Sequence, residues 1–288
     1  MSCLICESEQ AELVWQQGKL RIEECQGCGV LFALDRPSEE EMMRLYGGDQ
    51  LLRSRPDPSA SDQGPPPVWK QSEHMRILDR LAQRGVTNGT LLDVGCFSGM
   101  FLSNAKKRGF DCVGVEPNED ACLHVRNVQG FEVKKGSLES ARFASGRFSV
   151  VSFWDVIEHV PDPLSELRET FRVIRPGGWL ILTTPNVAGL LQRVVKTERW
   201  LTRRPFCPID DVPWHLWGFT GPSLAHCVEK AGFTVEEVLS LEPSPLSTNE
   251  GAGSSPWKQV GLRLVAKLSK LLDMSDRMAL LARKPSPA

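Results

Sequence analysis

The chain has 288 residues, of which 41% are hydrophobic and 24% are charged, a composition typical of a globular protein with one full domain and a smaller unit. Its formal net charge of -2 argues against a protein whose whole surface binds polyanions. The sequence contains no apolar run of membrane-spanning length and no basic-then-apolar leader at its start. We therefore expect no membrane span, no export and a cytoplasmic location.

Residues 1–48 contain four regularly spaced cysteines, Cys3 and Cys6, then Cys25 and Cys28. In a reducing compartment, cysteines spaced in this way are more often metal ligands than disulfides, and four thiolates can surround one zinc ion tetrahedrally. We therefore predict a small zinc ribbon with a structural Zn2+, since four protein ligands leave no open coordination position. Two unrelated reduced pairs, or a redox dithiol, are the alternatives.

The charge of the ribbon disfavours nucleic acid as a partner. Residues 1–48 carry nine acidic residues against four basic ones, whereas phosphate binding needs the opposite sign. We therefore expect a scaffolding, substrate-gating or dimerisation role for the ribbon. Residues 49–67 include five prolines and have the composition of a linker, and residues 68–288 form the second predicted domain.

From residue 68 onward, helix-like and strand-like patterns alternate. This alternation predicts an α/β fold with a mostly parallel, doubly wound sheet, to which a late antiparallel pair of strands is added. The five other cysteines are scattered, mostly among apolar neighbours, and are expected in the core. The expected helices lie near 68–84, 99–108, 118–128, 162–174, 221–231 and 257–272, and the expected strands near 90–95, 111–116, 131–135, 148–154, 178–184, 233–241 and 278–282.

A glycine-rich turn joins the first of these strands to the following helix. Gly95 and Gly99 permit a tight turn and let the backbone approach a ligand closely. Glu116 stands at the end of the next strand, 23 residues beyond Asp93, where a carboxylate can accept hydrogen bonds from ribose hydroxyls. Together these residues predict a nucleotide-type cofactor, without separating a nicotinamide dinucleotide from S-adenosylmethionine (SAM).

Several motifs in the same order resemble those of the class I SAM-dependent methyltransferases, and the resemblance covers roughly residues 68–284. It implies SAM as the cofactor and a Rossmann-like, seven-stranded, mostly parallel sheet with an antiparallel last strand. The motifs are residues 93–99 for the methionine portion, 116–118 for the ribose, 136–139 for the adenine, 154–160 for the segment between cofactor and acceptor, and 174–178 for a turn before a strand.

The resemblance also implies which residues contact the cofactor. The family usually has glycine where Phe97 stands and often aspartate where Ser137 stands, so Phe97 would narrow the space beside the methionine portion and Ser137 would weaken the contact with the adenine amine. The implied cofactor contacts are Asp93, Gly95, Cys96, Phe97, Gly99, Glu116, Pro117, Ser137, Leu138, Trp154 and Asp155.

Two histidines are the candidate catalytic residues. Methyl transfer from a sulfonium mainly needs positioning and exclusion of water, but a hydroxyl acceptor usually also needs a general base with a pKa near the working pH. His159 follows a strand at the edge where ligands bind in such folds, and His215 lies in an aromatic-rich segment that could line an acceptor pocket. A structural or helix-capping histidine is the alternative for each.

The N-terminal segment carries a resemblance of its own. Residues 25–32, 36–38 and 45–47 are similar to the zinc-ribbon leader of bacterial methyltransferases from natural-product and surface-polysaccharide pathways, and residues 215–220 and 229–233 resemble the same group. This implies a small-molecule or saccharide acceptor. A similarity to quinone-pathway O-methyltransferases implies, in addition, a lipid-like or lipid-linked acceptor.

Two segments combine apolar and basic residues. Residues 190–204 hold five Lys or Arg against one Glu, and residues 257–272 hold four basic residues and no acidic one. Such helices can lie on an anionic membrane surface or cap a site for an anionic substrate. The alternative is a solvated face over a packed apolar stripe. A peripheral contact with the inner membrane surface through either segment is thus one expectation.

These patterns predict an enzyme that transfers a methyl group from SAM to a small-molecule, saccharide or lipid-linked acceptor, at oxygen. One alternative is an RNA methyltransferase that holds its substrate with the ribbon, which the acidic ribbon disfavours. The sequence also lacks the Asn/Asp-Pro-Pro-aromatic motif after residue 154 that base-amine methylases commonly use. A non-catalytic SAM-binding scaffold is the other alternative. A dehydrogenase is disfavoured because nothing resembles a nicotinamide site.

Overall fold

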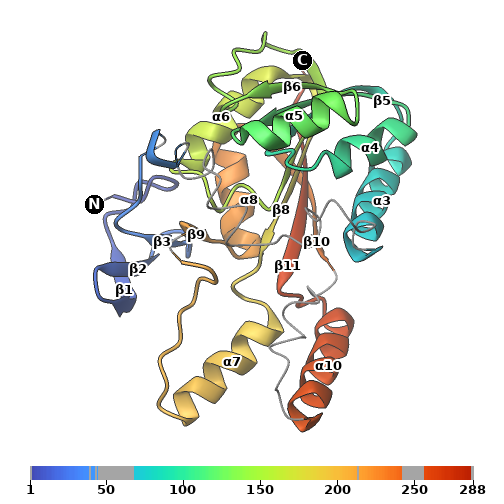
Figure 1. Cartoon of the computed structure of the whole chain (residues 1–288). Helices are drawn as coiled ribbons and strands as arrows, with labels where there is room; N and C mark the ends of the chain where they lie inside the picture. Colours follow the sequence, from blue (N-terminus) through green and yellow to red (C-terminus); the bar gives the residue numbers. More distant parts are fainter. Residues whose placement is uncertain are drawn as a thin grey trace.

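The computed structural model describes residues 2–38, 40–42, 44, 68–212, 214–241 and 256–286. The predicted linker over 49–67 lies outside these residues, so the division into 1–48, 49–67 and 68–288 stays a prediction. Within the described ranges no helix is both long and apolar enough to cross a lipid bilayer. Figure 1 shows a large central sheet flanked by helices, with a smaller sheet beside it near the N-terminus.

The large sheet is built from β4 (Gly89–Val94), β5 (Phe110–Glu116), β6 (Glu132–Lys135), β7 (Phe148–Trp154), β8 (Ile174–Pro185), β10 (Thr234–Ser240) and β11 (Arg277–Arg283). Its order is β10-β11-β8-β7-β4-β5-β6. The strands from β8 to β6 in this order are parallel to their neighbours, whereas β11 is antiparallel to both β8 and β10. The predicted Rossmann-like, mostly parallel sheet with an antiparallel last strand is confirmed.

The helices are α3 (Val68–Gln83), α4 (Met100–Lys107), α5 (Glu119–Asn127), α6 (Pro163–Val173), α7 (Leu190–Leu201), α8 (Gly221–Lys230) and α10 (Pro256–Leu271). α3, α4 and α5 pack on one face of the sheet and α6 and α8 on the other, since successive residues of a strand point to opposite sides. Leu91 of β4 packs with residues of α3, α4 and α5, whereas Leu92 packs with residues of α6 and α8. This burial on two faces explains the continuous apolar run of β7.

The smaller sheet is made, in this order, of β1 (Ala11–Gln17), β2 (Leu20–Cys25), β3 (Leu31–Ala33) and β9 (Trp217–Gly218), all antiparallel to their neighbours. β9 comes from the second predicted domain, so both predicted domains contribute to one sheet. The sequence patterns predict none of these four strands, because β9 has only two residues and β1 exposes most of its side chains.

One boundary differs from the prediction. The strand expected near 178–184 begins at Ile174, so the turn expected over 174–178 is the first part of β8. Gly177 has a φ of 74° and donates its N–H to the Lys284 carbonyl at 2.9 Å, while the Lys284 N–H donates to the Gly178 carbonyl at 2.9 Å. Pairing with the residues after β11 thus extends β8 through a glycine bend.

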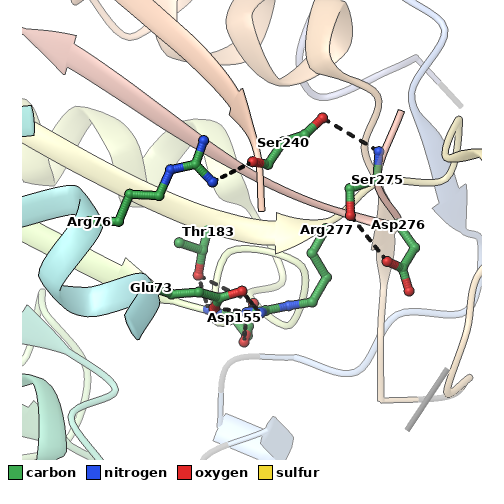
Figure 2. Close-up of polar contacts among 8 residues, drawn as sticks. All are labelled: Glu73, Arg76, Asp155, Thr183, Ser240, Ser275, Asp276 and Arg277. Atoms are coloured by element: carbon green, nitrogen blue, oxygen red, sulfur yellow. Dashed lines mark hydrogen bonds and ion pairs between the residues drawn. The ribbon is translucent and has the colours of Figure 1, made fainter. Parts of the chain in front are cut away.

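A buried ion triad ties α3 to the sheet (Figure 2). Arg277 on β11 donates through Nη1 to both carboxylate oxygens of Glu73 on α3, at 2.8 and 2.6 Å. Through Nη2 it donates to both oxygens of Asp155, just after β7, at 2.9 and 2.7 Å. Burial is the largest single influence and would raise the pKa of Asp155. The charges of Arg277 and Lys70 and the hydrogen bonds from Arg277 and Thr183 together outweigh it and lower that pKa to about 2. Arg277 is thus the shared counter-ion of two carboxylates from different elements.

Replacing Arg277 with alanine removes this counter-ion. Because breaking a buried ion pair from one side costs about 3–5 kcal/mol, we expect Arg277→Ala to lower the free energy of unfolding by that order, measured by urea denaturation with circular dichroism. Arg80→Ala is the matched control, since Arg80 of α3 pairs with Glu237 at 2.9 Å nearer the surface, where such pairs contribute about 1 kcal/mol or less. If both variants lower the free energy of unfolding by the same amount, the triad contributes no more to stability than a surface ion pair.

Candidate active site

The turn between β4 and α4 is held in a backbone conformation that favours glycine. Gly95 and Gly99 both have a φ of 70°, and a Cβ on Gly95 would lie 2.6 Å from Cγ2 of Val156, so the turn packs closely on the segment after β7. Phe97 also has a positive φ, of 42°. The position where the resembling family usually has glycine therefore adopts the conformation that glycine takes most easily.

Glu116 is the last residue of β5 and is buried beside this turn. Its Oε2 accepts the N–H of Phe97 at 2.8 Å, and its Oε1 accepts the N–H of Asn118 at 2.9 Å. Burial raises the pKa of Glu116 to about 7, while these two main-chain donors act in the opposite direction. Each carboxylate oxygen has a second lone pair, so the group is fixed in place and can still accept hydrogen bonds from two hydroxyls.

Two other predicted cofactor contacts turn their side chains into the interior. Asp93 on β4 is buried and its Oδ1 accepts the hydroxyl of Ser152 on β7 at 2.7 Å; burial raises its pKa to about 8. The Cys96 thiol is buried against Gly114 of β5, where a Cβ would lie 2.6 Å from the sulfur. Asp93 therefore couples two central strands, and Cys96 belongs to the core.

The residues after β5 and β6 lie at the same edge of the sheet. Pro117 follows Glu116 directly, and the N–H of Gly136 donates to the Glu116 carbonyl at 3.0 Å, so the turn after β6 is anchored to the end of β5. The Ser137 hydroxyl accepts the N–H of Ser140 at 3.2 Å within this turn. Leu138 is fully buried. The turn is thus joined to Glu116 through Gly136 and packs into the core through Leu138.

Trp154 ends β7 and Asp155 follows it, on the other side of the glycine turn. Trp154 contacts the rings of His74 and Phe101, with centroids 4.3 and 4.8 Å away, and its buried Nε1 has no hydrogen-bond partner among the described residues. Asp155 has a φ of 57° and accepts the Thr183 hydroxyl at 3.2 Å in addition to Arg277. The Asp155 carboxylate is therefore committed to the ion triad, whereas the Trp154 indole offers an N–H donor.

The structure brings the two candidate catalytic histidines together. The ring centroids of His159 and His215 are 4.6 Å apart. The contact between Nδ1 of His159 and the Trp214 carbonyl, at 3.0 Å, requires the proton on Nδ1, which leaves the ring lone pair on Nε2. Ligand atoms of Glu158, His159 and His215 all lie within 4.8 Å of one another, a donor set that can also hold a divalent cation.

Glu158 is a member of this cluster that the sequence analysis missed. Its Oε2 accepts the Thr184 hydroxyl at 3.0 Å, and its buried Oε1 has no hydrogen-bond partner within the described part of the chain. Burial, followed by the negative charge of Asp155, raises the pKa of Glu158 to about 8. Its position next to His159 was the available signal, since an acidic neighbour tunes an imidazole.

The parallel strands bring these groups to one edge of the sheet. β4 lies between β5 and β7, so Glu116 stands on one side of the glycine turn and the segment from Trp154 to His159 stands on the other. In open α/β sheets, ligands bind outside the carboxyl ends of the strands. One side of this edge therefore suits a polyhydroxyl group, and the other suits proton transfer.

The four cysteines of the ribbon form a second cluster. Their sulfur atoms are all within 4.8 Å of one another, with Cys3 and Cys28 at 3.8 Å and Cys6 and Cys25 at 3.4 Å. Tetrahedral zinc with Zn–S bonds near 2.3 Å implies sulfur separations of roughly 3.8 Å, so the donor set fits Zn2+. The contact with Cys28 lowers the pKa of Cys3 to about 5 and raises the pKa of Cys28.

Comparisons with known proteins agree on one family. The sequence model of a family described as a methyltransferase domain matches residues 69–238, more than half of the chain. The ubiquinone biosynthesis O-methyltransferase of Acinetobacter baumannii (strain AYE) is 30% identical over 173 residues, which cover 57% of this chain and 71% of that protein. The match thus covers most of the length of this relative.

Solved structures share the fold. The cyclase SpnF has a TM-score of 0.58 at 19% identity, covering 88% of this chain and 98% of its own. A SAM-dependent methyltransferase from Thermotoga maritima has a TM-score of 0.51 at 20% identity, covering 75% of this chain and 90% of its own. At these identities the likeness describes the architecture.

We expect the buried Glu116 carboxyl to make the free energy of unfolding depend on pH. Its pKa is about 7 in the folded chain against an ordinary value of 4.5, so between these values the folded state keeps a proton that the unfolded state has released. The free energy of unfolding therefore falls as pH rises from about 4.5 to 7. We expect Glu116→Gln, which cannot titrate, to remove this part of the slope, at most about 3 kcal/mol, as measured by urea titrations across that range.

Asp93 and Glu158, whose pKa values burial also raises, remain in the variant and preserve their own share of the slope. A loss of stability that is constant across pH reflects only the altered hydrogen bonds. If the curves of the variant and the natural protein stay parallel between pH 4.5 and 7, Glu116 does not take up the proton on folding.

Proposed function

This chain belongs to the SAM-dependent methyltransferases, and we propose that it transfers the methyl group of SAM to an oxygen of a small-molecule, saccharide or lipid-linked acceptor. The observation that carries the proposal is the placement of Glu116 and the His159–His215 pair on opposite sides of β4 at one sheet edge. Transfer to oxygen is supported by the Acinetobacter relative, which is named an O-methyltransferase.

The residues at this edge fit the cofactor. Glu116 would accept both ribose hydroxyls, since its carboxylate is already oriented by two main-chain N–H groups. Gly95–Gly99 would follow the methionine portion, with Asp93 and Cys96 supporting the turn from the interior. Ser137 and Leu138 would flank the adenine, and Pro117 would shape the turn beside the ribose. The Trp154 indole N–H, buried and without a partner among the described residues, would donate to a polar atom of the bound cofactor.

The histidine pair would remove the proton of the acceptor hydroxyl and orient the acceptor. When bound, SAM supplies an electrophilic methyl group on a sulfonium. Nε2 of His159 would take the hydroxyl proton as the acceptor oxygen bonds to the methyl carbon and the carbon–sulfur bond breaks, with its electron pair remaining on sulfur. His215, 4.6 Å away, would orient the acceptor. His159 would then release this proton to solvent.

Two substitutions separate the two sides of the site. Glu116→Ala removes the expected ribose contacts and should raise the SAM dissociation constant about tenfold or more, since hydrogen bonds to a charged group contribute about 1.5–3 kcal/mol each. His159→Ala should leave SAM affinity within about twofold but lower kcat by about 100-fold or more, the usual contribution of a general base. Calorimetry measures the first effect, and labelled SAM with candidate acceptors measures the second.

His226→Ala, on α8, is the matched control for His159 and should retain both affinity and turnover. Mass analysis after incubation with phenolic, saccharide, lipid-linked and RNA acceptors identifies the product, and assays with and without added Mg2+ distinguish proton transfer to His159 from metal-assisted ionisation. Failure of the natural protein to bind millimolar SAM would sink the enzymatic proposal. Binding without turnover on any acceptor would favour the scaffold alternative.

We further propose that α7 and α10 contact an anionic membrane surface. The two helices pack against each other beyond the ligand edge of the sheet (Figure 1), and none of the residues of α7 is buried. Exposed apolar side chains on both helices alternate with basic ones, a composition that suits anionic lipid headgroups over an apolar layer. These exposed apolar residues, together with Leu272 just after α10, are named here the α7–α10 face; on the helices they are Val194, Trp200, Leu201, Leu264, Leu268 and Leu271.

The α7–α10 face can be tested with vesicles. The double variant Trp200→Ser and Leu271→Ser removes two of its most exposed apolar side chains, 76% and 80% exposed. We expect about a tenfold or greater loss of binding to phosphatidylglycerol-containing vesicles in sedimentation assays, because each side chain loses apolar burial in the bilayer interface. Leu123→Ser, at an exposed leucine of α5, is the control. Equal binding of all three proteins, or none by the natural protein, would refute the contact.

A further inference from the structure

The segment that carries His215 is shared between the ribbon and the large domain. β9 pairs with β3 of the ribbon, with Phe32 opposite Trp217 and Leu31 opposite Gly218. The N–H of Ala33 donates to the Leu216 carbonyl at 2.9 Å, which extends the pairing to the residue beside His215. The ribbon thus holds one side of this segment through its backbone.

The other side of the same segment contacts the loop that carries His159. The N–H groups of Leu216 and Trp217 both donate to the Glu158 carbonyl, at 2.8 and 3.2 Å, and the Trp217 indole donates to the Val160 carbonyl at 2.8 Å. The His159 ring donates to the Trp214 carbonyl. Residues 214–217 therefore lie between β3 and the loop after β7, and the distance between the two histidines depends on both contacts.

Side chains pack this junction closely. The guanidinium of Arg36, which follows β3, lies 4.5 Å from the Trp217 ring centroid and 5.5 Å from that of Phe32. Such a cation over aromatic faces contributes about 0.5–2 kcal/mol. Gly218 is required on β9, because a Cβ there would lie 2.9 Å from both Ile209 and Val187 side-chain atoms. The Arg36 side chain thus stabilises the contact between the ribbon and residues 214–217.

The cysteine cluster fixes the position of β3. The Cys25 N–H donates to the Val30 carbonyl at 2.9 Å, and the Gly29 N–H donates to the Cys25 carbonyl at 2.8 Å, so the turn that holds Cys28 leads directly into β3. Cys3 and Cys25 are buried in the same core cluster as Phe32 and Trp217. Anything that loosens the four thiolates therefore moves the strand against which β9 is paired.

We propose that the four-cysteine ribbon is a positioning element for the acceptor side of the active site, acting through β3, Arg36 and β9 on the spacing of His159 and His215. The assignment of these histidines to the acceptor rests on the proposed function. Glu116, by contrast, takes its hydrogen bonds from the glycine turn and the residues just after β5. Loosening the ribbon should therefore change the acceptor side and spare the SAM side.

Arg36→Ala tests the inference in the full-length protein. We expect kcat for methyl transfer to fall roughly 10- to 100-fold, because small misplacements of catalytic groups have effects of this size, while the SAM dissociation constant changes less than about twofold and bound zinc stays at the natural level. Arg21→Ala is the matched control, since Arg21 lies on β2 of the same ribbon with an exposed side chain paired to Asp35 at 3.7 Å. It should retain full activity.

A second measurement does not depend on turnover. The chain has five histidines, and nitrogen-15 spectra of their rings resolve each tautomer. In Arg36→Ala, and after removal of zinc with a chelator, the resonances of His159 and His215 should shift. Those of His74, which packs against Trp154 in the other core cluster, should stay in place.

The outcomes separate this inference from the proposed function. If the natural protein transfers no methyl group but the two histidine resonances still respond to Arg36→Ala, the positioning role stands and the proposed reaction fails. Unchanged resonances of His159 and His215 in both Arg36→Ala and the zinc-depleted protein would overturn the positioning role. A parallel loss of SAM affinity would also overturn it, since it would show a general structural effect.

Discussion

Carboxyl groups buried near the ligand edge impose the main constraint on this structure, because a buried carboxyl must be hydrogen-bonded, ion-paired or protonated. Main-chain N–H groups hold Glu116 from both sides, whereas a single arginine serves Glu73. Glu158 has a partner for one oxygen and, among the described residues, none for the other. The incompletely satisfied group lies beside the two histidines, where a proton has to move in the proposed reaction.

The two sides of the site are built in different ways. On the proposed cofactor side, Glu116 is held by main-chain N–H groups of the glycine turn and of Asn118, so its geometry follows from local chain conformation. On the acceptor side, His159 and His215 come from segments far apart in sequence, and a third segment from the ribbon supports them. The locally built side can be retained while the side formed by distant segments changes. One fold can in this way serve many acceptors.

Much of the α/β domain could be predicted because its signals are local. The apolar run of β7, the glycine turn at Gly95 and the acidic end of β5 each depend on a few consecutive residues. The structure also places the two candidate histidines, His159 and His215, with their ring centroids 4.6 Å apart. The ion triad could not be predicted, because Glu73 and Arg277 are separated by 204 positions and carry no pattern that links them. β9 is a strand only because β3 lies opposite.

The pairing of β3 with β9 also has a consequence for biosynthesis. The ribbon leaves the ribosome long before Trp217 and Gly218 have been synthesised. Until then the edge of β3 that pairs with β9 has unpaired backbone groups. An open strand edge is a template for pairing with other chains, and β3 is only three residues long, which limits that hazard. Exchange of the ribbon between relatives by recombination would therefore have to carry the matching two residues of β9, encoded in a distant part of the gene.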